Sequence, residues 1–394
     1  MTINQLMKII PYAKQQIDHN DIEAVVNVLS SEYLTQGPTV ELFESCVSAY
    51  CNVRYAFATN SATSALHLAC MALELARGDL VWTTPNTFVA TANCALYCGA
   101  SVDFVDIDPH SYNMSISALS EKLIEAKKTN KLPKIVIPVH FAGYPSEMRE
   151  IKKLSELYGF KIIEDASHAI GAEYSGTKVG SCNFSDITIF SFHPVKIITC
   201  GEGGMAMTNS LSIAKKLKLY RSHGITSDIS EMESRPKEEI WNYQQILLGM
   251  NYRMTDILAA LGLSQLKKLD EFVSQRSKIA EIYSTSLQDL PLHLPLLNSE
   301  AKSSWHLYVV RLKLDKINKG QKDVYRKLRK DGVMVNLHYI PVYRQPFYEN
   351  MGFQEGYCPE AEKYFRECLS LPMYFGLTNE DQQFVVKTLN DTIC

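Results

Sequence analysis

Lys196 lies at the centre of the stretch FSFHPVKIITCGEGG, where its immediate neighbours are Val195 and Ile197. A partly buried lysine amine loses its proton more easily than one in water, and the uncharged amine attacks carbonyl carbons. An electron-sink cofactor such as pyridoxal phosphate (PLP) also needs an acid opposite its ring nitrogen, and Asp165 in KIIEDASHAIGA is a candidate. The pair predicts lysine carbonyl chemistry. The alternatives are a lysine that extends its ammonium to the surface and a strand-end aspartate that only caps a turn.

A hydroxyl-rich turn precedes the helical stripe of TNSATSALHLACMALELA. Thr63 and Ser64 lie where free backbone N–H groups and the positive end of the helix dipole favour a bound phosphate. Helix capping explains the same residues equally well. The turn is therefore a candidate phosphate site or a simple N-cap.

The elements that must position these groups alternate along the chain. Short apolar runs separated by helical stretches predict an α/β layer with a largely parallel sheet, whose ligands gather at the carboxyl ends of the strands. Asp165, Ser191 and His193 come at or just beyond such ends, and Phe88 follows the run that ends near Thr84. The runs are 80–84, 102–105, 134–140, 161–165, 186–191 and 204–208.

Gly201 to Ala206, GEGGMA, matches the G-x-G-x-x-G/A pattern of dinucleotide binding. That pattern must follow a strand and open a helix, whereas here it leads into the strand-like MAMT. We therefore disfavour a Rossmann oxidoreductase that uses NAD, and keep it as a rival enzyme class.

A chain of 394 residues exceeds the size at which one hydrophobic core stops growing. We expect a large α/β domain over 1–250 with the N-terminal segment, and a linking helix with a small α+β domain over 251–394. A long helical pattern over 249–287 predicts the link, and VMVNLHY, 333–339, predicts a strand. Between the first helical pattern and the next, Tyr33 to Thr39 should be an ordered loop.

Composition excludes several classes of function. The net charge of −3 and the absence of a basic block give no electrostatic case for nucleic-acid or membrane binding. The ten cysteines contain no CxxC pair, so reduced, mostly buried thiols are expected rather than disulfides or a metal site. The N-terminal stretch lacks a leader pattern, which makes the cytoplasm the expected location.

Taken together, NSATSAL, TTPNTFVATAN, EDASHAIGA, FSFHPVK, GEGG and NYRMTDILAALGLSQL resemble the DegT/DnrJ/EryC1/StrS family of PLP-dependent sugar aminotransferases. The motifs occur in family order and cover nearly the whole chain. The resemblance implies the type I fold of PLP-dependent transferases (aspartate aminotransferase-like). It also implies a homodimer whose active sites lie at the interface.

The matching positions imply definite roles. Lys196 would hold PLP covalently and carry the transferred proton, while Asp165 would pair with the pyridine nitrogen. His168 would meet the phenolic oxygen of PLP and Phe88 its ring face; a structural histidine and a core phenylalanine are the alternatives. The residues that would hold the phosphate are Thr63, Ser64 and Ser191, with Asn251 from the neighbouring subunit.

Within the family, LTQGPTVELFE and LHYIPVYRQPFY are most similar to members that aminate C4 of a UDP-linked 4-keto-6-deoxy-N-acetylhexosamine in pseudaminic acid biosynthesis, with L-glutamate as the implied donor. Members that lead to bacillosamine, perosamine or aminoarabinose have similar motifs. Relatives that deoxygenate sugars replace the lysine by histidine, so Lys196 favours transamination over a PLP-dependent dehydratase or epimerase. Candidate nucleotide-sugar contacts, each of which could instead pack at an interface, are Tyr33, His193, Arg253, His338, Tyr339 and Tyr343.

Overall fold

The computed structural model describes residues 8–234, 239, 241–295 and 300–394, and its centre is a seven-stranded sheet in the order β1-β9-β8-β5-β4-β2-β3. β9 runs antiparallel to both of its neighbours, and the other adjacent strands are parallel. The predicted α/β layer with a mostly parallel sheet is therefore confirmed. The strands are β1 (Tyr55–Thr59), β2 (Leu80–Thr83), β3 (Ser101–Phe104), β4 (Ile135–Ile137), β5 (Lys161–Asp165), β8 (Ile187–Ser191) and β9 (Gly204–Thr208).

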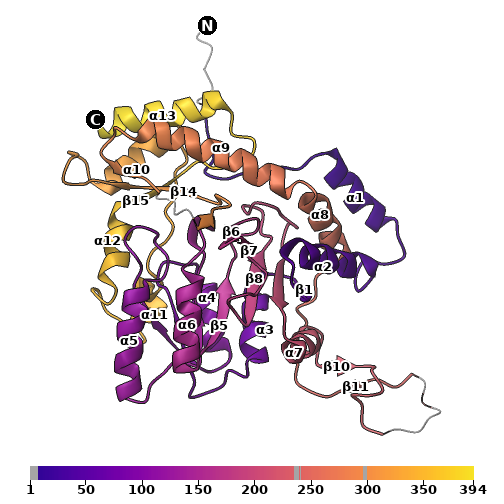
Figure 1. Ribbon diagram of the computed structural model, residues 1–394. Helices are drawn as coiled ribbons and strands as arrows, with labels where there is room; N and C mark the ends of the chain where they lie inside the picture. Colours follow the sequence, from indigo (N-terminus) through magenta and orange to yellow (C-terminus); the bar gives the residue numbers. More distant parts are fainter. Residues whose placement is uncertain (1–7, 235–238, 240, 296–299) are drawn as a thin grey trace.

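Helices cover both faces of this sheet (Figure 1). The central strands read as continuous apolar runs because alternate side chains enter two different cores: Ile163 faces one and Ile162 the other. One face carries α3 (Ala62–Ala72), α4 (Ala90–Tyr97) and α7 (Leu211–Arg221). The other carries α2 (Pro38–Cys51), α5 (Ile116–Lys128), α6 (Met148–Tyr158) and α8 (Asp256–Leu266).

A smaller α+β unit follows towards the C-terminus and lies against one end of the large sheet (Figure 1). Its antiparallel sheet, in the order β12-β14-β15, shares a core with three helices. Its elements are β12 (Leu292–His293), β14 (Tyr308–Leu312), β15 (Cys368–Leu371), α9 (Leu269–Leu287), α10 (Gln321–Lys330) and α13 (Asn379–Ile393). The short helices η2 (Val342–Arg344), α11 (Pro346–Glu349) and α12 (Pro359–Glu367) connect them.

Two expectations about this region are wrong. The helical pattern over 249–287 is divided, because α8 ends at Leu266 and α9 begins at Leu269. Residues 333–339 form no ladder; Val333 and Asn336 make single bridges to different partners, Ile10 and Ser370, which pull the segment out of any one sheet. Because α8 packs against α1 (His19–Leu29) and α2, the division of domains at residue 250 stays a prediction.

The loop between α1 and α2 is held by a buried carboxylate from α8. Asp256 accepts hydrogen bonds from the backbone N–H groups of Gly37, Thr39 and Val40, at 2.7 to 3.2 Å. These are N–H groups at the start of α2, which helical hydrogen bonding leaves unpaired. The loop is thus ordered, as predicted, although α2 already begins at Pro38.

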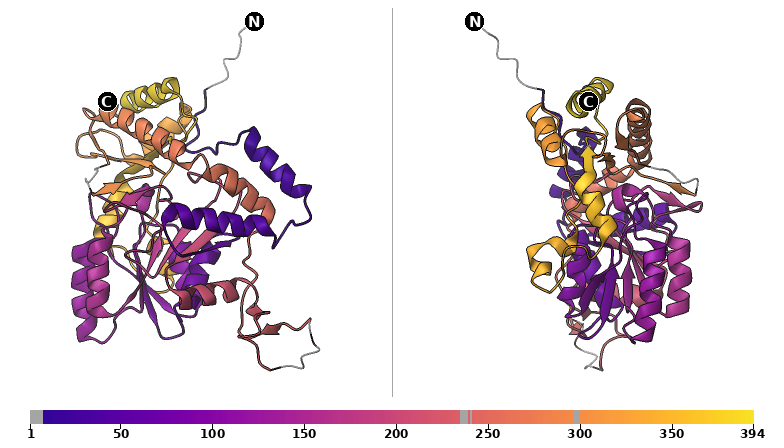
Figure 2. Two further views of the ribbon diagram at one scale, coloured as in Figure 1. Left: turned by 45° about the vertical axis from the view of Figure 1, so that its right-hand side comes forward. Right: turned by 90° about the vertical axis from the view of Figure 1, so that its left-hand side faces the viewer.

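A hairpin arm of β10 (Ile225–Thr226) and β11 (Gln244–Gln245) stands away from the body of the protein (Figure 2). Several of its side chains are apolar and exposed, among them Ile229, Trp241 and Leu248. Across the described ranges, we find no helix of the length and apolar character needed to span a bilayer.

Candidate active site

A cavity of about 310 Å³ opens at the carboxyl ends of β5 and β8, between the large sheet and the smaller unit. Its walls come from the start of α3, the segments after β2 and β5, the β8–β9 loop and the segment after Val333. This is the edge of the sheet that the sequence predicts for a ligand. The predicted residues that line it are Thr63, Phe88, Asp165, His168, Ser191, His193, Lys196, His338 and Tyr339.

Lys196 is half-buried in the loop between β8 and β9, where its backbone N–H closes a turn on the His193 carbonyl. Loss of hydration lowers the pKa of its amine to about 8, and the nearby Asp165 charge opposes that shift only in part. At neutral pH a substantial minority of the amine is therefore uncharged, which nucleophilic attack requires.

Asp165 ends β5 with its carboxylate buried in the floor of the cavity. Oδ2 accepts a hydrogen bond of 2.6 Å from the Thr91 hydroxyl, and Oδ1 accepts from the Ser167 hydroxyl at 2.5 Å and from its backbone N–H at 3.1 Å. These donors hold the carboxylate in one orientation. Asp165 also caps the turn that follows β5, because it accepts the Ser167 N–H within that turn. This is the alternative role that the sequence offered.

Thr91 and Thr87 are candidate functional residues that the sequence motifs alone did not predict. Their hydroxyl oxygens lie 2.8 Å apart and both line the cavity, so a buried chain of hydroxyls leads to Asp165. Their spacing of four residues within TTPNTFVATAN, at the start of a helix, was a signal that could have found them. Other lining residues that were missed are Tyr12, Ser61, Ser167, Glu202 and His306.

His168 is buried and its protonation follows from its partners. Nδ1 accepts the backbone N–H of Ala142 at 3.3 Å, so a neutral ring carries its proton on Nε2, which lies 3.2 Å from the Tyr339 hydroxyl. Burial, followed by the charge of Lys196, holds the pKa of His168 well below its ordinary value. The ring therefore presents a neutral N–H donor near the cavity.

Two further histidines from the smaller unit extend this cluster. The His306 ring packs 4.3 Å from that of His168, measured between centroids, and the Nδ1 of His306 has no hydrogen-bond partner among the described residues. His338 shares a hydrogen bond of 2.8 Å with Ser370, and burial lowers its pKa to about 3. The cluster is thus uncharged at neutral pH, which leaves Asp165 and Lys196 as the charged pair of the inner cavity.

The start of α3 forms the opposite end of the cavity. Ser61 caps the helix by accepting the Ser64 N–H at 3.1 Å, and the Ser64 hydroxyl donates to Asn60 at 2.6 Å. The N-cap of α3 is therefore Ser61, and neither Thr63 nor Ser64 caps the helix. Thr63 and Ser191 line the cavity, so an anion there would meet their hydroxyls and the positive helix end.

Five predicted residues lie outside this cavity, and one of them is Ser64. Tyr343 is buried in the core, where its hydroxyl donates to Glu362 at 2.6 Å. It therefore belongs to the packed core and does not line the cavity. Tyr33 is exposed on the α1–α2 loop. The exposed Asn251 and the half-buried Arg253 belong to a segment that pairs with Thr59, beside the start of α3, without lining the cavity of their own chain.

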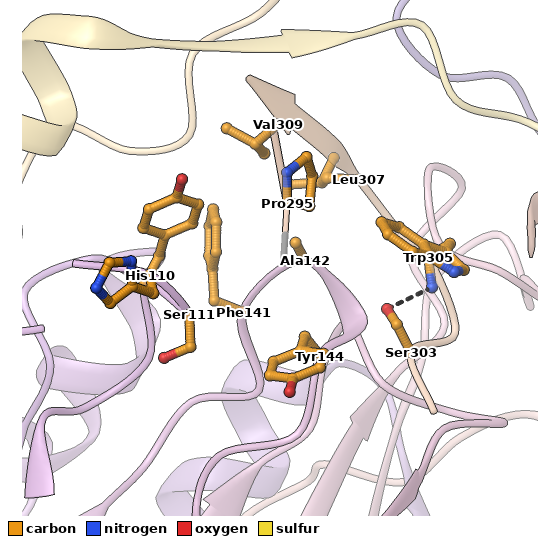
Figure 3. A pocket seen from close by; sticks show the side chains of 11 residues that line it. His110, Ser111, Phe141, Ala142, Tyr144, Pro295, Ser303, Trp305, Leu307 and Val309 are labelled. Carbon is orange, nitrogen blue, oxygen red and sulfur yellow. Dashed lines mark hydrogen bonds between the residues drawn. The ribbon is translucent and has the colours of Figure 1, made fainter. Parts of the chain in front are cut away.

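A second cavity, between η1 (Phe141–Gly143) and β14, has a volume of about 30 Å³ (Figure 3). Its walls are mainly apolar, with Phe141, Trp305 and Val309 among them, and the space suits about one water molecule. It brings no nucleophile and acid together. Across the described part of the chain, no group of His, Cys, Asp and Glu side chains could hold a metal ion.

Gly204 must remain a glycine for the phosphate end of the cavity to keep its shape. A Cβ at this position would lie 2.5 Å from Ser61 carbonyl atoms and from the Ala62 nitrogen, all of them backbone. We expect Gly204→Ala to lower the free energy of unfolding by about 1–3 kcal/mol, measured by denaturant titration. Gly376→Ala is the control, since its Cβ would meet only Gln16 Oε1 at 3.5 Å, and a change within about 0.5 kcal/mol is expected. Equal changes in the free energy of unfolding for the two substitutions would show that Gly204 is not required by the close approach of Ser61.

The fold and this site are those expected of an enzyme of lysine-based carbonyl and amine chemistry, with a candidate lysine nucleophile and a buried carboxylate on a mostly parallel α/β sheet. Residues 15–390 match the model of the DegT/DnrJ/EryC1/StrS aminotransferase family. The chain belongs to this family.

Relatives agree over nearly the full length. The UDP-4-amino-4,6-dideoxy-N-acetyl-beta-L-altrosamine transaminase of Campylobacter jejuni is 38% identical over 383 residues, which is 96% of each chain. The solved structure of Helicobacter pylori PseC, described as an aminotransferase involved in the biosynthesis of pseudoaminic acid, has a TM-score of 0.88 at 33% identity and covers 98% of this chain and 99% of its own. The PLP form of Spr1654 from Streptococcus pneumoniae, a putative sugar aminotransferase, has a TM-score of 0.86 at 26% identity over 98% of both chains. The expected type I fold of PLP-dependent transferases is confirmed.

Proposed function

We propose that this protein uses PLP to transfer an amino group from L-glutamate to C4 of a UDP-linked 4-keto-6-deoxy-N-acetylhexosamine, in pseudaminic acid biosynthesis. The observation that carries the proposal is the shared cavity of Lys196, whose amine has a lowered pKa, and Asp165, whose carboxylate is held by Thr91 and Ser167. Family membership and the names of the relatives from C. jejuni and H. pylori support the choice of sugar.

The residues present fit PLP. Asp165 would hold the protonated ring nitrogen, and Phe88 would cover the ring. Thr63 and Ser191, with the N–H groups at the start of α3, would hold the phosphate, and Lys196 would be the covalent anchor. When bound, the cofactor supplies an electron sink that makes the bond from the α carbon of an amino acid to its proton labile.

The protein's own groups then manage the protons. With PLP bound, the Lys196 amine would be the base that takes the α proton of the amino donor, and in the second half-reaction it would deliver a proton to the sugar carbon. The negative charge of Asp165 would keep a proton on the ring nitrogen of the bound cofactor. The neutral His168 ring can donate a hydrogen bond from its Nε2–H without becoming charged. The buried histidine cluster keeps bulk water away from this side of the cavity.

Covalent capture of PLP by the cofactor-free protein should depend on pH through Lys196. Since only the uncharged amine attacks, the rate should rise about tenfold per pH unit below pH 8 and level off above it. Stopped-flow absorbance between pH 6 and 10 measures this. A rate that climbs steadily to pH 10 would show an amine with the pKa of an exposed lysine. Asp165→Asn removes the charge that raises the amine pKa and should move the plateau to lower pH.

The sugar assignment is tested with a panel of UDP- and dTDP-linked 4-keto sugars plus L-glutamate, with products identified by mass spectrometry and NMR. We expect the highest kcat/KM for the UDP-linked 4-keto-6-deoxy-N-acetylhexosamine that precedes the altrosamine product. A higher kcat/KM for a bacillosamine-, perosamine- or aminoarabinose-type substrate would replace that assignment and leave the aminotransferase activity intact. Deoxygenation without amine transfer would overturn both.

We further propose a homodimer in which Asn251 of one copy serves the phosphate end of the other's cavity. Support comes from exposed apolar side chains that a single chain leaves uncovered. They include Ile22, Val26 and Leu29 on α1 and Trp241 on the hairpin arm. Asn251 itself is exposed at the base of that arm.

Subunit complementation tests this directly. Lys196→Ala and Asn251→Ala proteins, each inactive alone, should regain about a quarter of wild-type activity after mixing and subunit exchange. Half of the dimers are then hybrids with one intact site in two. Absence of recovery despite hybrid dimers seen by native mass spectrometry would place Asn251 in the cavity of its own chain.

A further inference from the structure

A buried histidine and a buried glutamate lie behind the active site, on the opposite face of β5. His140 follows β4, and its Nε2 lies 2.8 Å from Oε2 of Glu164, the residue before Asp165. Neither side chain lines the active-site cavity, and both are almost fully buried. They border instead a space of about 10 Å³ within the core on the other side of the sheet. Because successive side chains of a strand point to opposite faces, Glu164 points away from the cavity that Asp165 enters.

The hydrogen bonds of this pair determine which nitrogen of His140 carries the proton. Nδ1 accepts the backbone N–H of Ser146 at 3.0 Å, and a backbone N–H can only donate. Nδ1 therefore carries no proton, and the Nε2–H is the donor to Glu164. The other oxygen of Glu164 accepts the hydroxyls of Ser185 and Thr188. Every polar atom of the two side chains thus has a partner, and a buried polar network that is fully paired is held in one geometry.

The backbone around His140 reaches two groups of the active site. The His140 N–H donates to the Asp165 carbonyl at 3.0 Å, and the Asp165 N–H donates to the Pro138 carbonyl at 2.9 Å. Further along the same segment, the Ala142 N–H donates to His168 Nδ1 at 3.3 Å. The segment 138–142 therefore holds the end of β5, where the Asp165 carboxylate enters the cavity. It also determines which nitrogen of His168 carries the proton.

We propose that His140 and Glu164 are positioning residues of the aminotransferase reaction, which act through Asp165 and His168. This inference rests on the proposed function, because that function assigns Asp165 and His168 to the cofactor. The Glu164 carboxylate orients the His140 ring, and the ring anchors the segment 138–142. The segment in turn keeps the Asp165 carboxylate and the His168 Nε2–H in place. A displacement of an active group by about 1 Å can lower a rate about 100-fold, so contacts behind the site affect kcat.

Two substitutions at Glu164 test the contact with His140. Glu164→Leu keeps much of the side-chain volume but removes both acceptor oxygens, whereas Glu164→Gln keeps an acceptor for the His140 Nε2–H and can donate to the neighbouring hydroxyls. We expect kcat for the half-reaction with L-glutamate to fall about 10- to 100-fold in Glu164→Leu and less than about threefold in Glu164→Gln. KM for the UDP-linked sugar should stay within about twofold in both variants, because neither residue lines the cavity.

The matched control lies at the other end of β5. The buried Ser155 hydroxyl donates to the Phe160 carbonyl at 2.7 Å, one residue before Lys161 begins the strand. Ser155→Ala removes this buried hydrogen bond and leaves the segment 138–142 unchanged, so kcat should stay within about twofold of wild type. A loss of kcat in Ser155→Ala as large as that in Glu164→Leu would show that general loosening of the strand is sufficient, and would overturn the proposal.

The position of the proton on His168 is a readout that a merely structural role of the pair would not move. ¹⁵N NMR of the full-length, cofactor-free protein with labelled histidine reports the protonated ring nitrogen, and loss of signals in His168→Gln assigns them. We expect a proton on Nε2 alone in wild type and in Glu164→Gln, and a mixture of both tautomers in Glu164→Leu. Unchanged His168 signals in Glu164→Leu, or a kcat within about threefold of wild type, would contradict the positioning role.

His140 offers an independent pair of variants, which decides the question where Glu164→Leu does not fold. The amide nitrogen of glutamine reaches the place of Nε2 and donates to Glu164, whereas asparagine is too short. His140→Asn should therefore lower kcat about tenfold more than His140→Gln and should mix the His168 tautomers. Equal kcat values and equal His168 signals in the two variants would refute the inference. Wild-type protein without aminotransferase activity would overturn the proposed function, whereas the NMR comparison would still show whether the pair acts on His168.

Discussion

Lys196→Ala should abolish both the visible absorbance of covalently bound PLP and the transfer of amine to the sugar. We expect kcat/KM to fall by at least about 10⁴-fold, because the substitution removes the covalent anchor and the base that moves the proton in one step. Absorbance spectra of the purified protein and coupled 2-oxoglutarate release measure the two effects separately. The cavity walls remain, so the variant should still bind PLP without a covalent bond.

Lys196→Arg separates charge from nucleophilicity. Arginine keeps a positive charge beside Asp165 but stays protonated and cannot attack a carbonyl carbon. It should therefore be as inactive as Lys196→Ala. Activity within tenfold of wild type in either variant would remove Lys196 from the chemistry and with it the aminotransferase proposal. Exogenous methylamine that restores part of the activity of Lys196→Ala would instead support the assigned role of the base.

The sequence predicted the fold and the place of the cavity correctly where apolar runs alternate with helical stretches and polar residues follow the ends of those runs. The apolar runs became the strands of the central sheet, and Asp165 and Ser191 came to its carboxyl edge because the ends of parallel strands share that edge. GEGG reads as a dinucleotide motif only in isolation. In the structure it leads into β9, and Gly204 is required by the close approach of Ser61.

Contacts between distant segments leave no mark in a local sequence pattern. Nothing in the local pattern of His306 tells that its ring packs on His168, since the two are brought together by the position of the smaller unit on the large sheet. Tyr343 was expected near the sugar because it lies in LHYIPVYRQPFY, a motif that resembles those of related sugar aminotransferases. A buried carboxylate, Glu362, draws its hydroxyl into the core instead. Residues 333–339 have strand-like composition, but no single neighbouring strand offers them a complete ladder.

The hydroxyls around Asp165 give graded expectations. Thr91→Val keeps the shape of the side chain but removes the hydrogen bond to Oδ2, whereas Ser167 still donates to Oδ1. We expect a loss of about tenfold in kcat, equivalent to about 1.4 kcal/mol, the size of one charge-assisted hydrogen bond. Thr87 lies one hydroxyl further from Asp165, so Thr87→Val should lower kcat less than Thr91→Val does. An order of effects with Thr87 above Thr91 would show that the chain does not act through Asp165.

Asp165→Asn should lower kcat far more than Thr91→Val or Thr87→Val, although it hardly changes the shape of the side chain. An amide oxygen at the same place still accepts the Thr91 hydroxyl, so the melting temperature should stay within about 3 °C of wild type. The amide carries no charge, however, and cannot hold a proton on the ring nitrogen of PLP, so the negative charge that develops at the α carbon loses its stabilisation.

We expect kcat for the half-reaction with L-glutamate to fall by about 10³-fold or more, which corresponds to about 4 kcal/mol at the transition state. Covalent PLP should be retained, because Lys196 is unchanged. Single-turnover absorbance with L-glutamate measures the step directly, and loss of the α deuterium of labelled glutamate should slow in parallel. A variant that keeps a tenth of wild-type activity would mean that the buried carboxylate positions the loop after β5 rather than the electronics of the cofactor. Asp165→Glu decides between the two roles: it restores the charge in a longer side chain, so partial recovery over Asp165→Asn is expected only where charge is what the site requires.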